Sequence, residues 1–328
     1  MTRARVGRLG VWKRDASLQS SDVDSVAMLS MPKIAGSVRC VHEAQAMLGE
    51  GTCWSTRSQV LWWVDILARR LHRYRPADGA CAAWSFDEEI SAVAERRTAP
   101  GLIVTMRSGF ALFDPDADAA PRFLHRPDAE PSGNRFNDGK CDLAGRFWAG
   151  TMDFACRAPT GGLYRFDPDG RCTRHEIGFA VTNGPTWSLD ERAMYFNDTA
   201  RGRVLAFPFD AAAGAIGSPR EWLRFERGDG VPDGMTTDGS GRIWIAHWGG
   251  SCVSCHDPES GAELGRIELP ASQITNCCFG GPDLRTLYVT SARYLMSPEE
   301  DRTDVDAGSL YAITLDDVQG VPAHLFAL

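Results

Sequence analysis

Three short polar motifs in the sequence combine residue types that can bind a metal ion or a polar substrate. They span Asn134–Lys140, Thr182–Pro185 and Val231–Met235. Asn183 follows Asn137 by 46 positions, and Asp233 follows Asn183 by 50. An isolated Asn-Gly or Asp-Gly usually marks a turn, because Asn, Asp and Gly tolerate positive φ. Three such motifs at nearly even spacing instead predict an oxygen-rich pocket to which successive structural repeats each contribute one turn.

The oxygen ligands of these motifs suit a divalent cation. Asn183 and Asp233 carry the carbonyl and carboxylate oxygens that hard or borderline cations prefer. Glu50, which lies between two glycines near the start of the repeats, is a third candidate. One Asp, one Glu and one Asn would form a site of net charge about −2 with open coordination positions, as in catalytic metal sites. A Glu between glycines is also typical of a surface turn.

The elements that must position these residues read as short β-strands. Runs rich in β-branched or aromatic residues, bounded by Gly, Pro and Asp, fill the chain from about Val38, and helical periodicity is almost absent. Clear examples are Val60–Asp65, Leu71–Arg75, Gly101–Met106, Gly109–Phe113, Arg146–Gly150 and Gly162–Phe166. At about 47 residues per repeat, residues 48–328 hold roughly six repeats. The sequence therefore predicts an all-β fold, a six-bladed β-propeller with four antiparallel strands per blade.

The two ends of the chain lead to separate expectations. Residues 1–37 are charged, contain serine and lack a clear period, so we interpret them as a flexible N-terminal extension. Residues 38–328 then form a single propeller domain, because no linker interrupts them. Closed propellers usually join their ends, so we expect a strand near Cys40–Met47 to pair within the last blade and protect its edge.

Composition excludes several classes of protein. The chain has 328 residues and 43% hydrophobic residues, enough for one large domain with a sizeable core. A formal net charge of −8 without a basic cluster argues against a nucleic-acid partner. No run approaches the roughly 20 apolar residues of a membrane span, and the first residues lack the apolar region of a secretory signal. We therefore expect a cytoplasmic protein with neither a membrane nor a nucleic-acid partner.

The chain contains ten cysteines, and one pair has a suggestive spacing. Cys252–His256 has the Cys-x-x-Cys-His pattern of c-type haem attachment. The surrounding residues, however, read as strand, tight turn and strand. A zinc site would need a second pair at a matching distance, which the adjacent Cys277 and Cys278 do not supply. We interpret most of the cysteines as small buried residues and expect no haem.

Taken together, the motifs resemble the senescence-marker-protein-30/gluconolactonase family, the sugar-lactonase and regucalcin-like six-bladed propellers. The resemblance extends from about Leu48 to the C-terminus. Besides the three polar motifs, it is carried by Leu48–Gly51, Leu61–Ile66, Phe147–Met152 and Cys278–Arg293. Any one of these segments is weakly diagnostic, but their combination is specific.

The resemblance implies an activity and a set of site residues. The family's metal ligands match Glu50, Asn183 and Asp233, and its substrate-contacting residues match Arg135 and Asn137. The implied reaction is hydrolysis of a sugar lactone to an aldonic acid in carbohydrate catabolism, assisted by one divalent ion. Asp233 would be both a ligand and the general base. Ca²⁺, Zn²⁺, Mn²⁺, Fe²⁺ and Mg²⁺ all accept such oxygen ligands in some geometry.

The sequence departs from the family pattern at one position, whose role is open, and two alternative functions also remain. Some animal members carry a Glu that helps to hold the sugar a few residues beyond their Gly-Thr-Met. Here Gly150–Met152 is followed by Asp153, which either contacts a substrate hydroxyl or caps a turn. The alternatives are a non-catalytic, calcium-binding regucalcin-like propeller and a hydrolase of non-sugar lactones or esters with a more apolar pocket.

Overall fold

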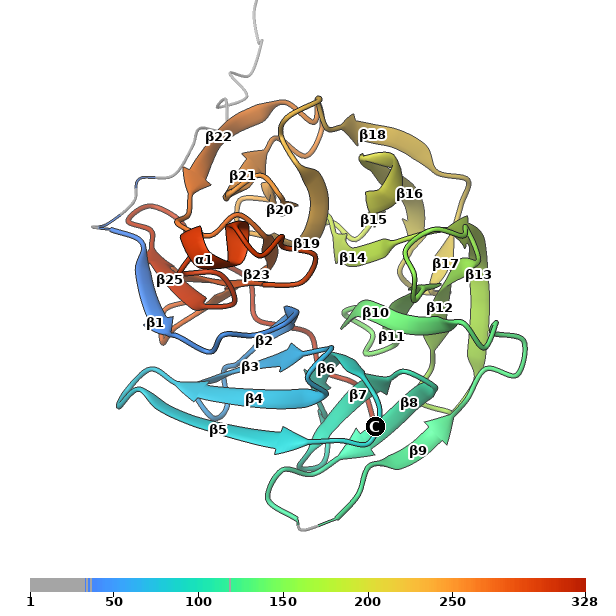
Figure 1. Ribbon diagram of the computed structural model, residues 1–328. Helices are drawn as coiled ribbons and strands as arrows, with labels where there is room; N and C mark the ends of the chain where they lie inside the picture. Colours follow the sequence, from blue (N-terminus) through green and yellow to red (C-terminus); the bar gives the residue numbers. More distant parts are fainter. Residues whose placement is uncertain (1–32, 34, 36, 118) are drawn as a thin grey trace, which may run out of the picture.

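The computed structural model describes residues 33, 35, 37–117 and 119–328. Residues 1–32, 34 and 36 lie outside the described residues, so the extension expected over 1–37 stays a prediction. In the described part, six antiparallel sheets surround a central axis like the blades of a propeller (Figure 1). The all-β fold and the six blades predicted from the sequence are therefore confirmed.

In five of the six blades the strands follow one another in sequence. The first two blades contain β2 (Gly49–Ser55), β3 (Val60–Asp65), β4 (Arg70–Arg75), β5 (Ala80–Ser85), β6 (Ile90–Glu95), β7 (Leu102–Met106), β8 (Gly109–Phe113) and β9 (Arg122–His125). The third and fifth blades contain β10 (Asn134–Cys141), β11 (Phe147–Asp153), β12 (Gly161–Phe166), β13 (Cys172–Phe179), β19 (Val231–Thr237), β20 (Ile243–Trp248), β21 (Cys252–His256) and β22 (Glu263–Glu268). In all four, the first strand lies at the centre of the molecule (Figure 1).

The fourth and sixth blades have additional features. The fourth contains β14 (Thr182–Trp187), β15 (Ala193–Asp198), the short helix η1 (Thr199–Arg201), β16 (Arg203–Asp210), β17 (Ala215–Ile216) and β18 (Arg220–Arg224). Its β17 and β18 both pair with β16, so this blade departs from the predicted four strands. The sixth contains β23 (Ile274–Gly280), β24 (Thr286–Ser291), α1 (Glu300–Thr303), β25 (Leu310–Thr314) and β1 (Arg39–His42).

The N-terminal strand closes the ring of blades. β1 pairs antiparallel with β25, with Arg39 opposite Ala312, and forms the outer edge of the last blade. This pairing confirms the closing strand expected near Cys40–Met47. Because the first and last parts of the chain share one sheet, the propeller is held together by backbone hydrogen bonds.

Buried apolar residues fill the space between neighbouring blades. Trp63, Trp148 and Trp244 lie on the second strands of their blades and are among the largest fully buried side chains. The Trp148 indole donates a hydrogen bond to Asp142, and the Trp244 indole donates one to Asp238 at the equivalent turn, each over 2.9 Å. The two equivalent contacts show that the blades repeat one structural unit.

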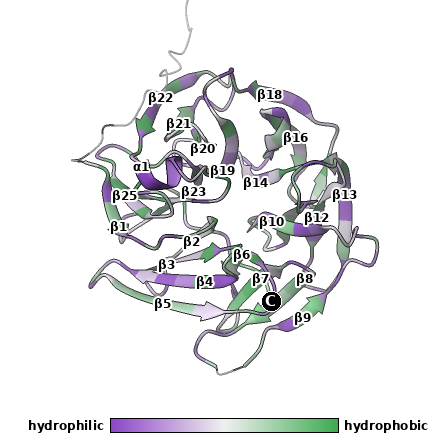
Figure 2. Ribbon diagram, viewed as in Figure 1, coloured by the Kyte–Doolittle hydropathy of each residue, from purple (hydrophilic) through white to green (hydrophobic). Residues whose placement is uncertain are grey.

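Hydropathy follows this packing, as Figure 2 shows. β7 and β8 are largely hydrophobic, whereas α1 is hydrophilic and lies between β24 and β25 in sequence. Within the described part of the chain, no helix has the length and apolar composition needed to span a membrane.

The inner strands are irregular where the polar residues lie. All six have a shift in register against their neighbour, at Glu50/Cys53, Ile90/Ala92, Phe136/Gly139, Asn183/Thr186, Pro232/Met235 and Ile274/Asn276. A β-bulge of this kind bends the strand and redirects a side chain. The polar motifs therefore lie inside the inner strands, which corrects the interpretation of them as turns or loops. The Asn, Asp and Gly residues that are typical of turns are accommodated here by bulges within the strands.

Candidate functional site

A cavity of about 330 Å³ lies at the first residues of the inner strands. We call it the acidic cavity, because two buried carboxylates line it. Five of the six predicted site residues line this cavity: Glu50, Arg135, Asn137, Asn183 and Asp233. They come from four different blades, so the fold brings together residues up to 183 positions apart in sequence.

The two carboxylates are almost completely buried. Glu50 is 2% exposed and Asp233 is 3% exposed. Burial, followed by the nearby charge of Asp138, raises the pKa of Glu50 to about 8. Burial, followed by the charges of Glu50 and Asp138, raises the pKa of Asp233 well above its ordinary range. Without a cation, this end of the protein therefore favours protonated carboxyl groups.

Arg135, Asn137 and Asn183 form a hydrogen-bonded chain across the floor of the cavity. Arg135 Nη1 donates to the Phe136 carbonyl over 3.0 Å and to Asn137 Oδ1. Asn137 Nδ2 donates to Asn183 Oδ1 over 2.9 Å and to the Thr182 carbonyl over 2.6 Å. These bonds fix the orientation of the amide oxygens and hold the guanidinium beside them.

The arrangement of donors fits a divalent cation. Within the described residues, no three His, Cys, Asp or Glu side chains gather into a metal cluster, and the donor set here is two carboxylates and one amide. Asp233 Oδ1 is buried and has no hydrogen-bond partner among the residues that the structure describes. A buried carboxylate oxygen without a partner is unfavourable unless a cation or a proton satisfies it. Glu50, Asn183 and Asp233 are thus the residues that would hold the ion.

Sequence reasoning missed Asn276, which supports this site from below. Asn276 Nδ2 donates to Glu50 Oε2 over 3.0 Å and to Asp138 Oδ2 over 3.3 Å. Its Oδ1 accepts a hydrogen bond of 2.7 Å from the Thr52 hydroxyl. Asn276 is fully buried and follows Asp233 by 43 positions, so the blade spacing continues to it and could have identified it. It holds one oxygen of Glu50 in place.

The glycine after Asp233 is required by close packing. A Cβ at Gly234 would lie 2.3 Å from Asn276 Nδ2 and 2.8 Å from Asn276 Cα. No side chain fits there without displacing Asn276. The Asp-Gly pair on β19 therefore brings the fifth blade against the sixth.

Asp153 differs from the other predicted site residues. Its carboxylate accepts backbone hydrogen bonds from Ala155 over 3.3 Å, Arg157 over 2.9 Å and Ala158 over 2.8 Å. It is not among the residues that line the acidic cavity. These bonds lower the pKa of Asp153, with the one from Ala158 contributing most. Of the two readings that the sequence left open, the contacts fit the turn cap, and Asp153 stays outside the proposed substrate contacts.

The Cys-x-x-Cys-His segment is β21, the third of the four strands in the fifth blade. Cys252 and Cys255 are fully buried on β21, and Cys255 packs against Trp244 in the core. His256 Nε2 is 2.7 Å from the Ser254 hydroxyl, and its Nδ1 is 3.0 Å from the Gly261 carbonyl. Both nitrogens of this histidine thus have partners within the blade.

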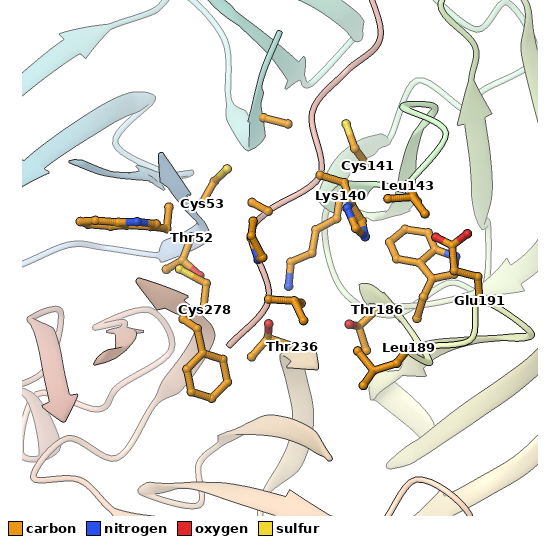
Figure 3. A pocket seen from close by; sticks show the side chains of 18 of the residues that line it. Thr52, Cys53, Lys140, Cys141, Leu143, Thr186, Leu189, Glu191, Thr236 and Cys278 are labelled. Carbon is orange, nitrogen blue, oxygen red and sulfur yellow. The ribbon is translucent and has the colours of Figure 1, made fainter. Parts of the chain in front are cut away.

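A second cavity of about 270 Å³ lies at the other end of the inner strands. Figure 3 shows the Lys140 side chain projecting into it, so we call it the lysine cavity. The Lys140 ammonium donates a hydrogen bond to the Met235 carbonyl. Its charge lowers the pKa of Asp138, which burial raises overall. Neither Lys140 nor Asp138 lines the acidic cavity.

These features define a six-bladed propeller with an acidic, metal-compatible site at one end of its axis. Residues 48–293 match the family described as SMP-30/Gluconolactonase/LRE-like region. The chain therefore belongs to the SMP-30/gluconolactonase family, as the sequence motifs predicted. The match covers five complete blades and every residue that lines the acidic cavity except Tyr294 and Leu295.

Similar proteins include both enzymes and calcium-binding proteins. A protein of Bacillus subtilis (strain 168) named as a candidate sugar lactone lactonase, YvrE, is 35% identical over 274 residues, covering 84% of this chain and 93% of that protein. Regucalcin of Gallus gallus is 35% identical over 295 residues, covering 88% and 98%. A solved structure of the calcium-binding protein regucalcin from Agrobacterium tumefaciens has a TM-score of 0.84 at 29% identity, covering 90% and 98%.

Proposed function

We propose that this protein is a metal-dependent lactonase, which hydrolyses a lactone of the sugar-acid type to the open hydroxy acid. The observation that carries the proposal is the buried pair of Glu50 and Asp233 beside Asn183, with Asp233 Oδ1 unpartnered in the cavity. The family membership and the lactonase name of the Bacillus subtilis relative support the same activity. The calcium binding named for the Agrobacterium tumefaciens protein supports a divalent ion.

The chain's own residues supply binding, orientation and proton transfer. A divalent ion held by Glu50, Asn183 and Asp233 would polarise the lactone carbonyl and lower the pKa of a water molecule. Asp233 accepts the proton of the attacking water at its carboxylate. Arg135 directs its free guanidinium N–H groups at the lactone oxygens, and Asn137 holds the guanidinium in place.

The reaction balances with water as the only co-substrate. The water oxygen bonds to the carbonyl carbon, and the ring carbon–oxygen bond breaks. The proton taken by Asp233 then passes to the ring oxygen, which becomes the hydroxyl group of the product.

A non-catalytic calcium-binding propeller would need only the metal ligands. Arg135 and Asn137 line the same cavity and are 4% exposed each, which is more than ion binding alone requires. Burying a guanidinium is unfavourable, and burial indeed lowers the pKa of Arg135. An arginine placed in such a position is explained by an oxygen-rich substrate.

The proposal is tested by acid release from a panel of fresh sugar lactones, followed with a pH indicator. Metal-stripped protein is assayed alone and after single divalent ions are restored, with Asp233→Ala as the negative control. We expect ion-dependent turnover above spontaneous hydrolysis. Confirmed ion binding without turnover of any lactone would favour a binding propeller instead. Asp233→Asn tests the general base, because full turnover by that variant would remove Asp233 from the proton transfer.

A further inference from the structure

The wall of the acidic cavity above its floor is rich in carbon. The residues that form it include Leu48, Met152, Val181, Val231, Trp248 and Leu295. None of these side chains carries a carboxylate, amide or guanidinium group, which are the usual partners of sugar hydroxyls. The Tyr294 hydroxyl and the Trp248 indole N–H are the polar groups of this wall, so a substrate hydroxyl that faces its aliphatic part finds few hydrogen-bond partners.

The polar groups of the floor are already engaged with one another. Asn137 and Asn183 donate to neighbouring oxygens, and Asn183 Nδ2 bonds the Thr199 hydroxyl over 3.0 Å. That hydroxyl donates in turn to the Pro232 carbonyl over 2.8 Å. Free donors remain mainly on Arg135, next to the proposed reaction centre. Recognition by hydrogen bonding is thus concentrated at one end of the cavity.

Leu295 occupies an unusual position in the wall. Its residue is 68% exposed, and its φ is +63°, in the left-handed region that leucine rarely adopts. The backbone N–H of the preceding Tyr294 donates a hydrogen bond of 2.9 Å to the Met47 carbonyl. The Tyr294 ring packs edge-on against Trp248, with 6.5 Å between the ring centroids. An exposed leucine held in this conformation beside aromatic rings offers an apolar contact to a bound molecule.

We propose that the preferred substrate is a lactone with an alkyl substituent on the ring carbon bonded to the ring oxygen. When the lactone carbonyl lies at the polar floor, the ring oxygen separates the carbonyl carbon from the substituted ring carbon. The substituent on that ring carbon then faces the apolar wall. Deoxy sugar lactones and simple alkyl lactones share this chemistry. The inference rests on the proposed lactonase function and adds which part of the lactone the wall recognises.

Two matched pairs of lactones test the preference. L-Fucono-1,5-lactone and L-galactono-1,5-lactone share their stereochemistry and carry a methyl or a hydroxymethyl group, respectively, on the carbon bonded to the ring oxygen. γ-Hexalactone and γ-butyrolactone differ in an ethyl group on the carbon beside the ring oxygen. With the full chain and its divalent ion, we expect kcat/KM to be at least about 10-fold higher for the first member of each pair. Preference in the first pair alone identifies a deoxy sugar lactone, and preference in the second alone identifies a simple alkyl lactone.

A variant at Leu295 tests whether this residue causes the preference for alkyl-substituted lactones. Leu295→Asn introduces a residue that readily adopts positive φ, and its side-chain amide can bond a hydroxyl. We expect the ratio of kcat/KM within each preferred pair to fall by at least about fivefold, from the loss of apolar contact and the gain of a hydroxyl partner. Leu189→Asn is the matched control, because Leu189 is also exposed, at 49%, but lines the lysine cavity. Calorimetric ion binding and thermal unfolding should be unchanged in Leu295→Asn.

The outcomes separate this inference from the function on which it rests. Equal rates within both pairs, or faster hydrolysis of the hydroxylated and unsubstituted lactones, would overturn the inference and leave the lactonase function standing. An unchanged ratio in a folded, ion-binding Leu295→Asn variant would also overturn it. Failure to hydrolyse any of the four lactones or the sugar-lactone panel, despite ion binding, would overturn the proposed function itself.

Discussion

The two cavities at opposite ends of the inner strands are similar in size but differ in chemistry. The acidic cavity has a volume of about 330 Å³ and holds buried carboxylates, one with an oxygen that lacks a partner. The lysine cavity has a volume of about 270 Å³ and is lined by Lys140, Glu191 and His324 together with hydroxyls, thiols and apolar side chains (Figure 3). Both are built from the same inner strands. Unsatisfied buried charge, and not cavity size, is therefore what distinguishes the proposed reaction site from the other cavity.

The local structure of the inner strands explains the difference. The acidic cavity lies where every inner strand is bulged, so side chains such as Glu50 and Asp233 can turn toward the axis. The lysine cavity lies where the same strands pair regularly with their neighbours, as at Trp54 opposite Leu61 and Thr236 opposite Trp244. Asn276 and Asp138 form a hydrogen-bonded layer between the two ends.

The largest expected effect separates the two ends directly. Asp233→Ala removes an ion ligand and the proposed base, so we expect kcat/KM for lactone hydrolysis to fall by more than about 1,000-fold. Glu191→Gln removes a carboxylate from the lysine cavity and should leave the rate within about twofold of wild type. Initial rates at saturating ion concentration check both variants. Comparable losses in the two would mean that the acidic cavity is not the reaction site.

A smaller effect is expected from the layer beneath the ion ligands. Asn276→Ala removes the hydrogen bond that positions Glu50, so we expect ion affinity to weaken by about 10–100-fold. Thr186→Val is the matched control, because it removes a buried hydrogen bond of 2.8 Å to Thr237 at the other end. Calorimetric titration should show weaker binding only for Asn276→Ala. Equal affinities in the two variants would show that Asn276 does not position the site.

The pH dependence of stability offers a third contrast. The folded-state pKa of Glu50, about 8, lies above its ordinary value of 4.5. Between these values the folded, ion-free protein holds a proton that the unfolded chain has released. The contribution of Glu50 to the free energy of unfolding is therefore largest below pH 4.5 and is lost as the pH rises through 8. We expect the thermal midpoint of ion-free protein to fall by several degrees over this range.

Two controls test the source of this pH dependence. A saturating divalent ion should flatten the profile at high pH, because it favours the ionised carboxylates that the ion-free protein disfavours. Glu50→Gln should flatten the profile without an ion, because it removes the titrating group. A thermal midpoint of ion-free wild type that rises between pH 5 and 8 would contradict the assigned pKa of Glu50.

The smallest effect is expected at Asp153. Its carboxylate caps the turn over residues 155–158, so Asp153→Ala should lower the thermal midpoint slightly. KM and kcat should each change by less than about twofold, because Asp153 does not line the acidic cavity. Steady-state kinetics across the preferred lactone pair checks this expectation. A large increase in KM would return Asp153 to the substrate contacts.

Much of the fold could be predicted from the sequence because it is repeated. Period, strand composition and turn residues all indicated six blades, and the strand Arg39–His42 closes the ring as expected. The extra pairing of Ala215–Ile216 was not predicted, since a two-residue strand leaves no periodic pattern.

The site was predictable where polar residues are followed by glycine or proline. Glu50, Asn183 and Asp233 each precede a glycine, whereas Arg135 and Asn137 were found through the family motif. Asn276 was missed because it lies in the otherwise apolar run Ile274–Gly280, where an amide carries no turn signal. The position of Leu295 depends on how the long connection between β24 and β25 folds over the cavity, which strand periodicity does not determine.

The central claim is that one divalent ion in the acidic cavity makes this propeller a lactonase. The most direct test measures calorimetric ion binding and lactone hydrolysis on the same metal-stripped preparation during one ion titration. The account predicts that hydrolysis is absent without ion and increases in proportion to the occupancy of a single site, which Asp233→Ala abolishes. Full hydrolysis by the stripped protein, or an occupied site without hydrolysis of any lactone, would contradict it.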